Sequence, residues 1–306
     1  MKVAELLRDR HRGCLLGLAA GDALGTTVEF KQRGSFAPLD DMIGGGPFRL
    51  QPGQWTDDTS MALCLAESIV EVGWDPGDQM RRYVRWYREG HLSSTDRCFD
   101  IGNITRDALH RFEETGNPFA GPTGERSAGN GSLMRLAPVP MRFALDPEVA
   151  GTRAAESSRT THGAAVAVDA CRVLCRMLVD ALAGVPKDEL LAPGRYEAET
   201  VEISAIAEGS FHSLGADDLS ASGYVVHTLE AALWALATTD DFRSGALRAV
   251  NLGNDSDTTG AVYGQLGGAI YGAQAIPVTW REQLTLHDTI VNLADRLHGL
   301  AGSDAT

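Results

Sequence analysis

The sequence predicts an all-α fold, and three observations support that prediction. Apolar residues recur at helical spacing along nearly the whole chain, and no stretch alternates convincingly with the period of two that a strand requires. Glycine is unusually frequent, at 34 of 306 residues, against a usual share of about 7%. With 43% apolar and 22% charged residues, the chain is too hydrophobic for disorder and long enough to bury a full core. We expect one multi-helix domain over residues 1–306.

Two glycine ladders predict how the central helices meet. Glycines recur at every fourth position in two segments, Gly13, Gly17, Gly21 and Gly25 in the first and Gly260, Gly264, Gly268 and Gly272 in the second. Positions four apart share one face of a helix, so each ladder forms a ridge where another backbone can approach closely. Glycine costs about 1 kcal/mol relative to alanine inside a helix, which implies a strong packing demand. We expect two central helices packed on each other; the alternative is that these glycines lie in loops, with Gly25 beyond a helix end.

Further segments have the apolar stripe of a helix. The stripes are Met61, Ala62, Leu65, Ala66 and Ile69; then Val225, Leu229, Ala232, Leu233 and Leu236; then Ile290, Leu293, Ala294 and Leu297. Residues 163–184 are apolar on most sides and predict a buried helix. Residues 33–54 and 115–132 are rich in Gly and Pro and predict long loops over the same body, and long loops in compact domains are usually functional.

Charge and cysteine content exclude some classes of protein. The 27 Lys and Arg against 41 Asp and Glu leave a formal net charge of −14. Free nucleic acid is therefore not an expected partner, because a protein that binds a phosphate backbone needs a basic face. Five scattered cysteines without a CxxC pair indicate reduced thiols and a cytoplasmic location. Cys171 and Cys175 are expected to be small core residues rather than ligands.

Two segments imitate membrane or export signals, and neither fits. Residues 258–280 carry no charge, but their glycines, two glutamines and one proline favour a buried helix over a membrane span. The arginines before residues 14–20 resemble the start of a signal peptide. Glu5 and Asp9 interrupt that basic stretch, and the apolar run is short. No membrane partner is expected.

The strongest local signal is Trp55-Thr56-Asp57-Asp58-Thr59, before a helix that we expect to begin near Ser60. Thr56 or Asp57 can cap that helix. Two carboxylates a few Å apart repel by around 1 kcal/mol in water, and by more where they are partly buried, unless a proton or cation lies between them. Taken alone, the motif is more typical of a well-capped helix start than of a metal site.

A second aspartate motif changes that balance. Asn254-Asp255-Ser256-Asp257-Thr258-Thr259 precedes the second glycine ladder. Residues two apart do not share a helix face, so Asp255 and Asp257 converge only in a loop or at a helix start. Mg²⁺ and Mn²⁺ prefer carboxylate, hydroxyl and water oxygens. Four aspartates with two threonine hydroxyls are enough for two such cations.

Seven segments carry a resemblance to a known family: GCLLGLAAGDALGTTVEF, WTDDTSMALCLAESI, CFDIGNITRDAL, GNGSLMRLAPVP, THGAAVAVDACRVL, GYVVHTLEAALWAL and NLGNDSDTTGAVYGQLGGAIYG. In this order, from Gly13 to Gly272, they resemble the ADP-ribosylglycohydrolase family, specifically the bacterial branch similar to dinitrogenase-reductase-activating glycohydrolase. The resemblance implies a compact orthogonal bundle of helices. It also implies a binuclear Mg²⁺ or Mn²⁺ centre that hydrolyses the bond between ADP-ribose and a modified group, often arginine.

The resemblance assigns the metal ligands. Six residues match the two metal motifs of the family: Thr56, Asp57 and Asp58 in the first and Asp255, Asp257 and Thr258 in the second. Asn254 and Ser256 stand at variable positions of the second motif, and neither removes a ligand. The resemblance therefore implies a complete ligand set.

It also implies candidates for acid and base catalysis. Glu29 matches an acidic residue on a loop that approaches the metals in relatives, where it activates or positions water; the alternative is an exposed loop glutamate. Asp100 matches a substrate-side acid of arginine-specific relatives, and its carboxylate can bind a guanidinium at two points or protonate it as it leaves. Asp58 is the other candidate to assist the leaving nitrogen. Asp22 is expected to cap or pair inside the fold.

The remaining candidates lie on the substrate side. Gly102 and Asn103 would shape the turn after Asp100. Gly129-Asn130-Gly131-Ser132 resembles the loop whose backbone N–H groups and hydroxyl hold the diphosphate, although a bare GNGS is more typical of a turn. His162 is expected at the head of a helix, where it would contact phosphate or ribose. Tyr224 either stacks on adenine or packs at the start of its own helix.

The predicted function is metal-dependent removal of ADP-ribose from a modified protein side chain, with arginine favoured. The metals would hold the distal ribose beside an activated water, with Glu29 or an aspartate of the metal shell as base. The expected partner is an ADP-ribosylated protein or an ADP-ribose conjugate. Two alternatives stay open: hydrolysis of serine-linked or O-acyl ADP-ribose, and ADP-ribose binding without catalysis.

Overall fold

The computed structural model describes residues 3–301, and this part of the chain is all-α, as predicted. Its α-helices are α1 (Val3–Gly25), α2 (Asp57–Val72), α3 (Pro76–Glu89), α4 (Asn103–Thr115), α5 (Pro138–Arg142), α6 (Pro147–Thr161), α7 (Ala165–Ala183), α8 (Lys187–Leu190), α9 (Val201–Ala207), α10 (Val225–Ala237), α11 (Phe242–Val250), α12 (Ser256–Tyr271), α13 (Val278–Gln283) and α14 (His287–Ala301). Five short 3-10 helices join them: η1 (Thr26–Val28), η2 (Glu125–Ser127), η3 (Ser210–Ser213), η4 (Ala216–Asp218) and η5 (Ala273–Ala275). In place of a sheet, the described residues contain two isolated bridges, Gly45 to Leu50 and Gly129 to Tyr224.

The two glycine ladders interlock at the centre of the molecule. A Cβ atom on Gly21 of α1 would overlap the carbonyl oxygen of Gly260 in α12, and a Cβ on Gly264 would overlap the carbonyl oxygen of Gly17. Only backbones without side chains approach this closely. The prediction that these two helices pack on each other is confirmed. Gly25 is the last residue of α1 rather than a residue beyond it, whereas Gly272 is the C-cap residue after α12 and so is not part of the helix.

The contact between the two ladders also brings the C-terminal end of α1 against the N-terminal end of α12. A Cβ on Gly25 would overlap the backbone of Ser256 and Asp257 at the start of α12. The chain that leaves α1 therefore begins its path directly beside the second aspartate motif. In this way the packing of two helices fixes the place of the site.

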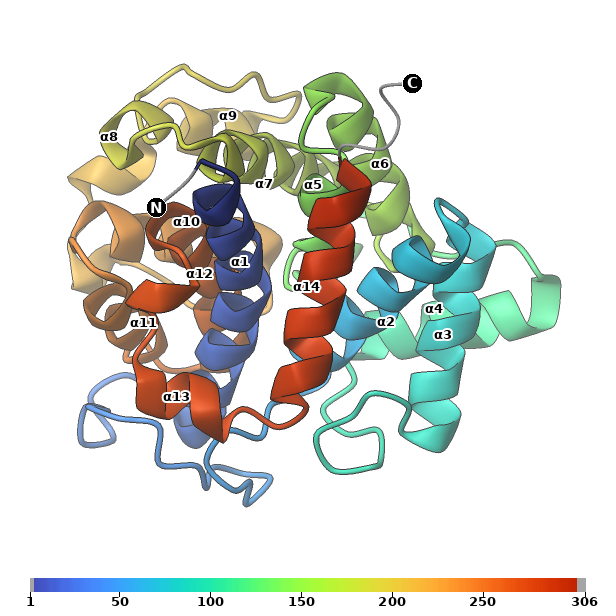
Figure 1. The fold of residues 1–306 in the computed structure, drawn as a ribbon, viewed down its shortest axis with the longest axis horizontal. Helices are drawn as coiled ribbons and strands as arrows, with labels where there is room; N and C mark the ends of the chain where they lie inside the picture. The colour runs from blue at the N-terminus through green and yellow to red at the C-terminus, as the bar shows by residue number, and fades with distance from the viewer. Residues whose placement is uncertain (1–2, 302–306) are drawn as a thin grey trace.

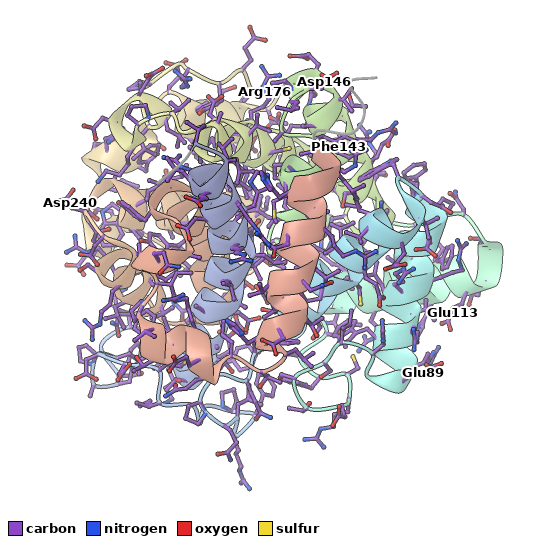
Figure 2. The ribbon with its side chains drawn as sticks, in the orientation of Figure 1. Glu89, Glu113, Phe143, Asp146, Arg176 and Asp240 are labelled. Atoms are coloured by element: carbon purple, nitrogen blue, oxygen red, sulfur yellow. The ribbon has the colours of Figure 1, made fainter. Side chains whose placement is uncertain are left out.

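The other helices surround this pair (Figure 1). α14 lies beside α1, α2 to α4 form one side of the molecule, and α7 to α11 form the other. Every residue of the three predicted apolar stripes is buried. Charged side chains such as Glu89, Glu113 and Asp240 lie at the outer surface (Figure 2).

The apolar parts of the ambiguous segments lie inside this core. Residues 14–20 belong to α1, and residues 258–271 belong to α12, whereas residues 272–280 continue into η5 and the start of α13 and are partly exposed. Cys171 and Cys175 are buried on α7, as expected of core residues. Within residues 3–301, no helix has both the length and the apolar content that a bilayer crossing requires.

Candidate metal centre and substrate pocket

A pocket of about 870 Å³ opens at the N-terminal end of α12. Its lining includes most of the predicted site residues: Glu29, Asp57, Asp100, Gly102, Gly129, Asn130, Gly131, His162, Asp255, Asp257 and Thr258. It also includes residues that had no role assigned from the sequence, among them Phe30, Ile104, Thr105, Met134, Ser222 and Gly223. All except Ser222 lie in segments that carry the family resemblance, but their side chains are mostly apolar or small, so their place in the lining is seen only in the folded chain.

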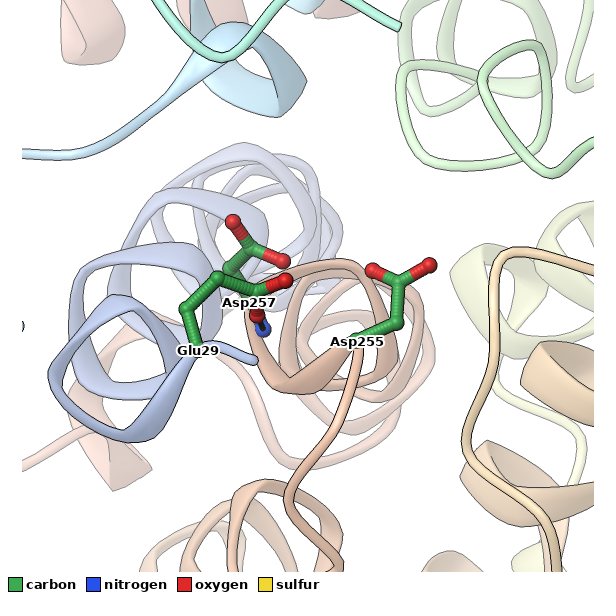
Figure 3. Close-up of side chains that lie close together, drawn as sticks. All are labelled: Glu29, Asp255 and Asp257. Carbon is green, nitrogen blue, oxygen red and sulfur yellow. Dashed lines mark hydrogen bonds between the residues drawn. The ribbon is translucent and has the colours of Figure 1, made fainter. Parts of the chain in front are cut away.

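Three carboxylates meet at the start of α12. One carboxylate oxygen each from Glu29, Asp255 and Asp257 lies within 4.8 Å of the other two. Figure 3 shows Glu29 reaching in from the chain that follows α1, while the two aspartates project from the beginning of α12. Glu29 is 3% exposed, so the alternative of an exposed loop glutamate is wrong.

Glu29 also accepts hydrogen bonds from the free backbone N–H groups at the N-terminal end of α12. Its Oε2 atom accepts hydrogen bonds from the backbone N–H of Ser256 at 2.8 Å and of Asp257 at 3.2 Å, and from the Ser256 hydroxyl at 3.1 Å. Asp255, at the N-cap position, makes no side-chain cap bond. Glu29, which is distant in sequence, therefore caps the N-terminus of α12, where the helix dipole favours a negative charge.

The first aspartate motif is held by Asp22 of α1. The Asp22 carboxylate accepts hydrogen bonds from the backbone N–H and the hydroxyl of Thr56, and from the same two groups of Thr59. The prediction that Asp22 caps or pairs inside the fold is confirmed. Two other predictions are wrong: α2 begins at Asp57 rather than near Ser60, and neither Thr56 nor Asp57 caps it with its own side chain.

The two motifs approach each other at Thr56. Its Oγ1 atom lies 3.3 Å from Asp58 Oδ2 and 3.3 Å from Asp257 Oδ2. Thr56 and Asp58 do not line the pocket but lie directly behind it, and both are buried. The other oxygen of Asp58, Oδ1, is buried without a hydrogen-bond partner. A buried carboxylate oxygen without a donor fits a site that a cation completes.

Burial and mutual repulsion strongly raise the pKa values of the acidic residues in the pocket. Burial first, then the charges of Asp257 and Asp255, raise the pKa of Glu29 to about 12. Burial first, then Asp257 and Asp57, raise the pKa of Asp100 to about 11. The pKa of Asp257 rises to about 7, again through burial and then Asp255. Carboxylates that oppose one another's ionisation form a favourable site for hard divalent cations, which take oxygen ligands.

Asp100 faces this cluster from the loop before α4. It has a positive φ of 61°, an uncommon conformation for a residue with a side chain and one that often marks functional sites. Gly102 is the N-cap of α4 and Asn103 its first residue, so both shape the turn that follows Asp100.

The GNGS segment lies between the metal motifs and His162. Asn130 Nδ2 donates hydrogen bonds to Asp255 Oδ2 at 2.9 Å and to Thr228 Oγ1 at 2.8 Å, which ties this loop to the second aspartate motif. A Cβ atom on Gly129 or Gly131 would press against the ring of His162. Side chains at these two positions would therefore displace the loop.

Two predictions about this region need correction. The Ser132 side chain is turned into the interior, where its hydroxyl lies 2.9 Å from that of Ser158, so this hydroxyl does not face the pocket. His162 is the C-cap residue that follows α6 and does not head the next helix, which begins at Ala165. In both cases the C-terminal end of α6 contacts the GNGS segment, through Ser158 and through the His162 ring.

Tyr224 lies at the margin of the site. It is the N-cap residue of α10, and its ring centroid lies 5.1 Å from that of His227. Its neighbours Ser222 and Gly223 line the pocket, whereas Tyr224 does not. Stacking on adenine stays a prediction.

The fold and the two carboxylate motifs together define a class of protein. The family model described as ADP-ribosylglycohydrolase matches residues 4–306. The chain belongs to this family.

Two relatives and one solved structure are similar to this chain over most of its length. The chain is 42% identical over 296 residues to "ADP-ribosylarginine hydrolase Tri1" of Serratia proteamaculans (strain 568), covering 96% of this chain and 80% of the relative. It is 35% identical to "ADP-ribosyl-[dinitrogen reductase] glycohydrolase" of Rhodospirillum rubrum, covering 97% and 98%. A solved structure titled "ADP-ribosylglycohydrolase-related protein complex" superposes with a TM-score of 0.87 at 46% identity, covering 97% of this chain and 99% of that one.

Proposed function

We propose that this chain hydrolyses the N-glycosidic bond between ADP-ribose and an arginine side chain, with two divalent cations, Mg²⁺ or Mn²⁺. The observation that carries the proposal is the convergence of both aspartate motifs and Glu29 at one end of a pocket of about 870 Å³. The names of two relatives support the choice of arginine, since each is 42% or 43% identical to this chain and is called an ADP-ribosylarginine hydrolase.

The ligand set proposed for the cations is Thr56, Asp57, Asp58, Asp255, Asp257 and Thr258. The partnerless Oδ1 atom of Asp58 and the raised pKa values of the acids support it. Bound there, the cations would supply Lewis-acid stabilisation of developing negative charge and a hold on the ribose hydroxyls. The acids themselves would orient the ribose end of the substrate against the start of α12.

Glu29 and Asp100 are the proposed base and acid. Glu29 reaches the carboxylate cluster, and its hydrogen bonds with the start of α12 hold it in place. Without cations the neighbouring carboxylates keep it protonated; two bound cations would neutralise those charges and lower its pKa, so that it could take a proton from water. Asp100 keeps its proton at neutral pH because burial and the neighbouring carboxylates raise its pKa. A protonated carboxyl can donate to the leaving guanidine nitrogen.

A panel of ADP-ribose linked to arginine, to serine and through an acyl ester tests the reaction class. We expect release from the arginine conjugate with Mg²⁺ or Mn²⁺ and no release after chelation with EDTA. Faster release from the serine or acyl conjugate would replace the proposed linkage. Tight binding of ADP-ribose in calorimetry without release from any conjugate would make the protein a binding module.

The Asp100→Asn variant tests the leaving-group side. Because the amide can accept and donate hydrogen bonds but cannot transfer the proton, we expect kcat for the arginine conjugate to fall by about 100-fold or more. Affinity for free ADP-ribose, which has no leaving group, should change little. We further propose that the substrate is an ADP-ribosylated protein in the cytoplasm, which the five free cysteines support.

A further inference from the structure

Arg135 is a fully buried arginine, and no carboxylate of residues 3–301 lies within ion-pairing distance of it. Its guanidinium donates hydrogen bonds to neutral acceptors instead: Tyr83 Oη, Gly131 O, Ser157 O, Thr160 Oγ1 and Thr161 Oγ1. It also lies over the ring of Tyr83, 4.8 Å from the centroid. A guanidinium remains charged inside proteins, and a buried charge is costly unless something balances it. The fold keeps this cation beside the pocket without an internal counter-ion.

The pocket itself has no positive side chain for a diphosphate. Its lining contains five acids and, among the residues that the structure describes there, neither lysine nor arginine. His162 lines it too, but burial and then the charge of Arg135 lower the pKa of His162 to about 3. The imidazole is therefore neutral at physiological pH.

Arg135 controls how one peptide of the GNGS segment points. Its Nη1 atom donates to the carbonyl oxygen of Gly131 at 2.6 Å. In a trans peptide the N–H group points away from the C=O group, so the N–H of Ser132 points away from Arg135. Neither this N–H nor that of Gly131 donates a hydrogen bond within the described part of the chain. Gly131 lines the pocket, so its free N–H lies at the pocket wall, and the N–H of Ser132 is the next donor along the same loop.

A second chain of hydrogen bonds runs from Arg135 to His162. Arg135 Nη2 donates to Thr161 Oγ1 at 2.8 Å, and Thr161 Oγ1 lies 2.9 Å from His162 Nδ1. Arginine only donates, so the threonine hydroxyl is free to give its own proton to Nδ1. The imidazole then carries its proton on Nε2. That atom lies against Gly129 and Gly131, so its N–H joins the backbone donors at the same wall.

We propose that Arg135 is the positioning residue of a diphosphate subsite: it orients the Gly131–Ser132 peptide, sets the His162 tautomer through Thr161, and supplies the positive charge behind both. The inference rests on the proposed function only for the identity of the ligand, an ADP-ribose diphosphate. Arg135 stays one peptide away from the ligand, which is why the pocket lining does not contain it. The substrate diphosphate supplies the negative charge that balances Arg135, which no carboxylate of the described residues provides.

Binding measurements test this without any turnover. Arg135→Met removes the charge and the donors, and Thr161→Val removes only the relay to His162 while keeping side-chain shape. Tyr83→Phe is the matched control, because it removes one hydrogen bond of Arg135 on the side away from the loop. Calorimetry measures affinity for ADP-ribose and, separately, for Mn²⁺ alone. The ¹⁵N spectrum of the His162 ring reports its tautomer.

We expect Arg135→Met to weaken ADP-ribose binding by about tenfold or more, as for loss of a charged group, and to leave Mn²⁺ affinity unchanged. Thr161→Val should weaken ADP-ribose binding several-fold and shift the His162 ring from the Nε2–H form, whereas Tyr83→Phe should do neither. Unchanged ADP-ribose affinity in Arg135→Met, or equal losses for ADP-ribose and Mn²⁺, would overturn the proposal. If Arg135→Met does not fold, Thr161→Val decides: an unaltered tautomer and affinity would overturn it. A wild-type protein that binds ADP-ribose but releases none from arginine contradicts the proposed function and leaves this test intact.

Discussion

Glu29 and Ser256 are 227 positions apart, yet the Glu29 carboxylate accepts hydrogen bonds from both the backbone N–H and the hydroxyl of Ser256. The Ser256 hydroxyl also lies 2.8 Å from the carbonyl oxygen of Gly25, the last residue of α1. The Ser256 side chain therefore joins the end of α1, the start of α12 and the carboxylate cluster. The packing of the two helices and the geometry of the site depend on each other.

The first prediction concerns Glu29→Gln. A glutamine oxygen can still accept from the N–H of Ser256, and in the metal-free protein Glu29 itself holds its proton because its pKa is raised to about 12. Stability without metal should therefore change by less than about 1 kcal/mol. With the cations bound, release of ADP-ribose should fall by about 100-fold or more, because an amide cannot replace the carboxylate that would act as base there. Steady-state kinetics and thermal unfolding measure both effects. Glu89→Gln, on the exposed end of α3, is the control, and wild-type turnover in Glu29→Gln would contradict the assigned role.

The second prediction concerns the pH dependence of the metal-free protein. Asp257 has a pKa of about 7 in the fold, against about 3.9 in an unfolded chain. Between these values the folded state binds more protons than the unfolded state, so the free energy of unfolding falls as pH rises. We expect a lower Tm at pH 8 than at pH 5.5 in EDTA. Excess Mg²⁺ should reduce that difference, since a cation replaces the proton. A Tm in EDTA that is higher at pH 8 would refute the idea of a repelling cluster.

The third prediction separates stability from activity at Asp257. Asp257→Asn removes one of the repelling carboxylates, so the metal-free protein should have an equal or higher Tm at pH 8. The same change should lower release of ADP-ribose by about 100-fold or more, because a metal contributes several kcal/mol to the transition state. Calorimetry with Mn²⁺ should show weakened binding. Asp240→Asn, at an exposed side chain, should leave all three measurements unchanged. Normal Mn²⁺ affinity in Asp257→Asn would remove this residue from the ligand set.

Local spacing predicted the helices, the packing of the two glycine ladders and the two aspartate motifs, but not the individual side-chain contacts between distant segments. The glycine ladders and apolar stripes could be predicted because helical periodicity is a local property of the sequence. The aspartate motifs could be recognised because acidic residues so close together are unusual. Asp22 was expected to cap or pair inside the fold, but the sequence did not show with which residue, since its partner Thr59 lies 37 positions away. Arg135 gave no signal either. A single arginine in an apolar segment shows its role only when the loop and helix around it are folded.

The last prediction tests the glycine ladder itself. A Cβ on Gly264 would overlap the carbonyl oxygen of Gly17, and neither backbone can move without shifting its whole helix. We therefore expect Gly264→Ala to destabilise the protein by more than about 3 kcal/mol, at the upper end for overpacked cores, and to lower Mn²⁺ affinity because α1 and α12 carry the site. Gly299→Ala is the matched control: this glycine also lies in a helix, α14, but a Cβ there meets no atom within 4 Å. Alanine at that position should stabilise the helix by up to about 1 kcal/mol. Urea unfolding of both variants gives opposite signs if the ladder is a true backbone contact, and equal stabilisation by both substitutions would show that α1 and α12 do not meet as described.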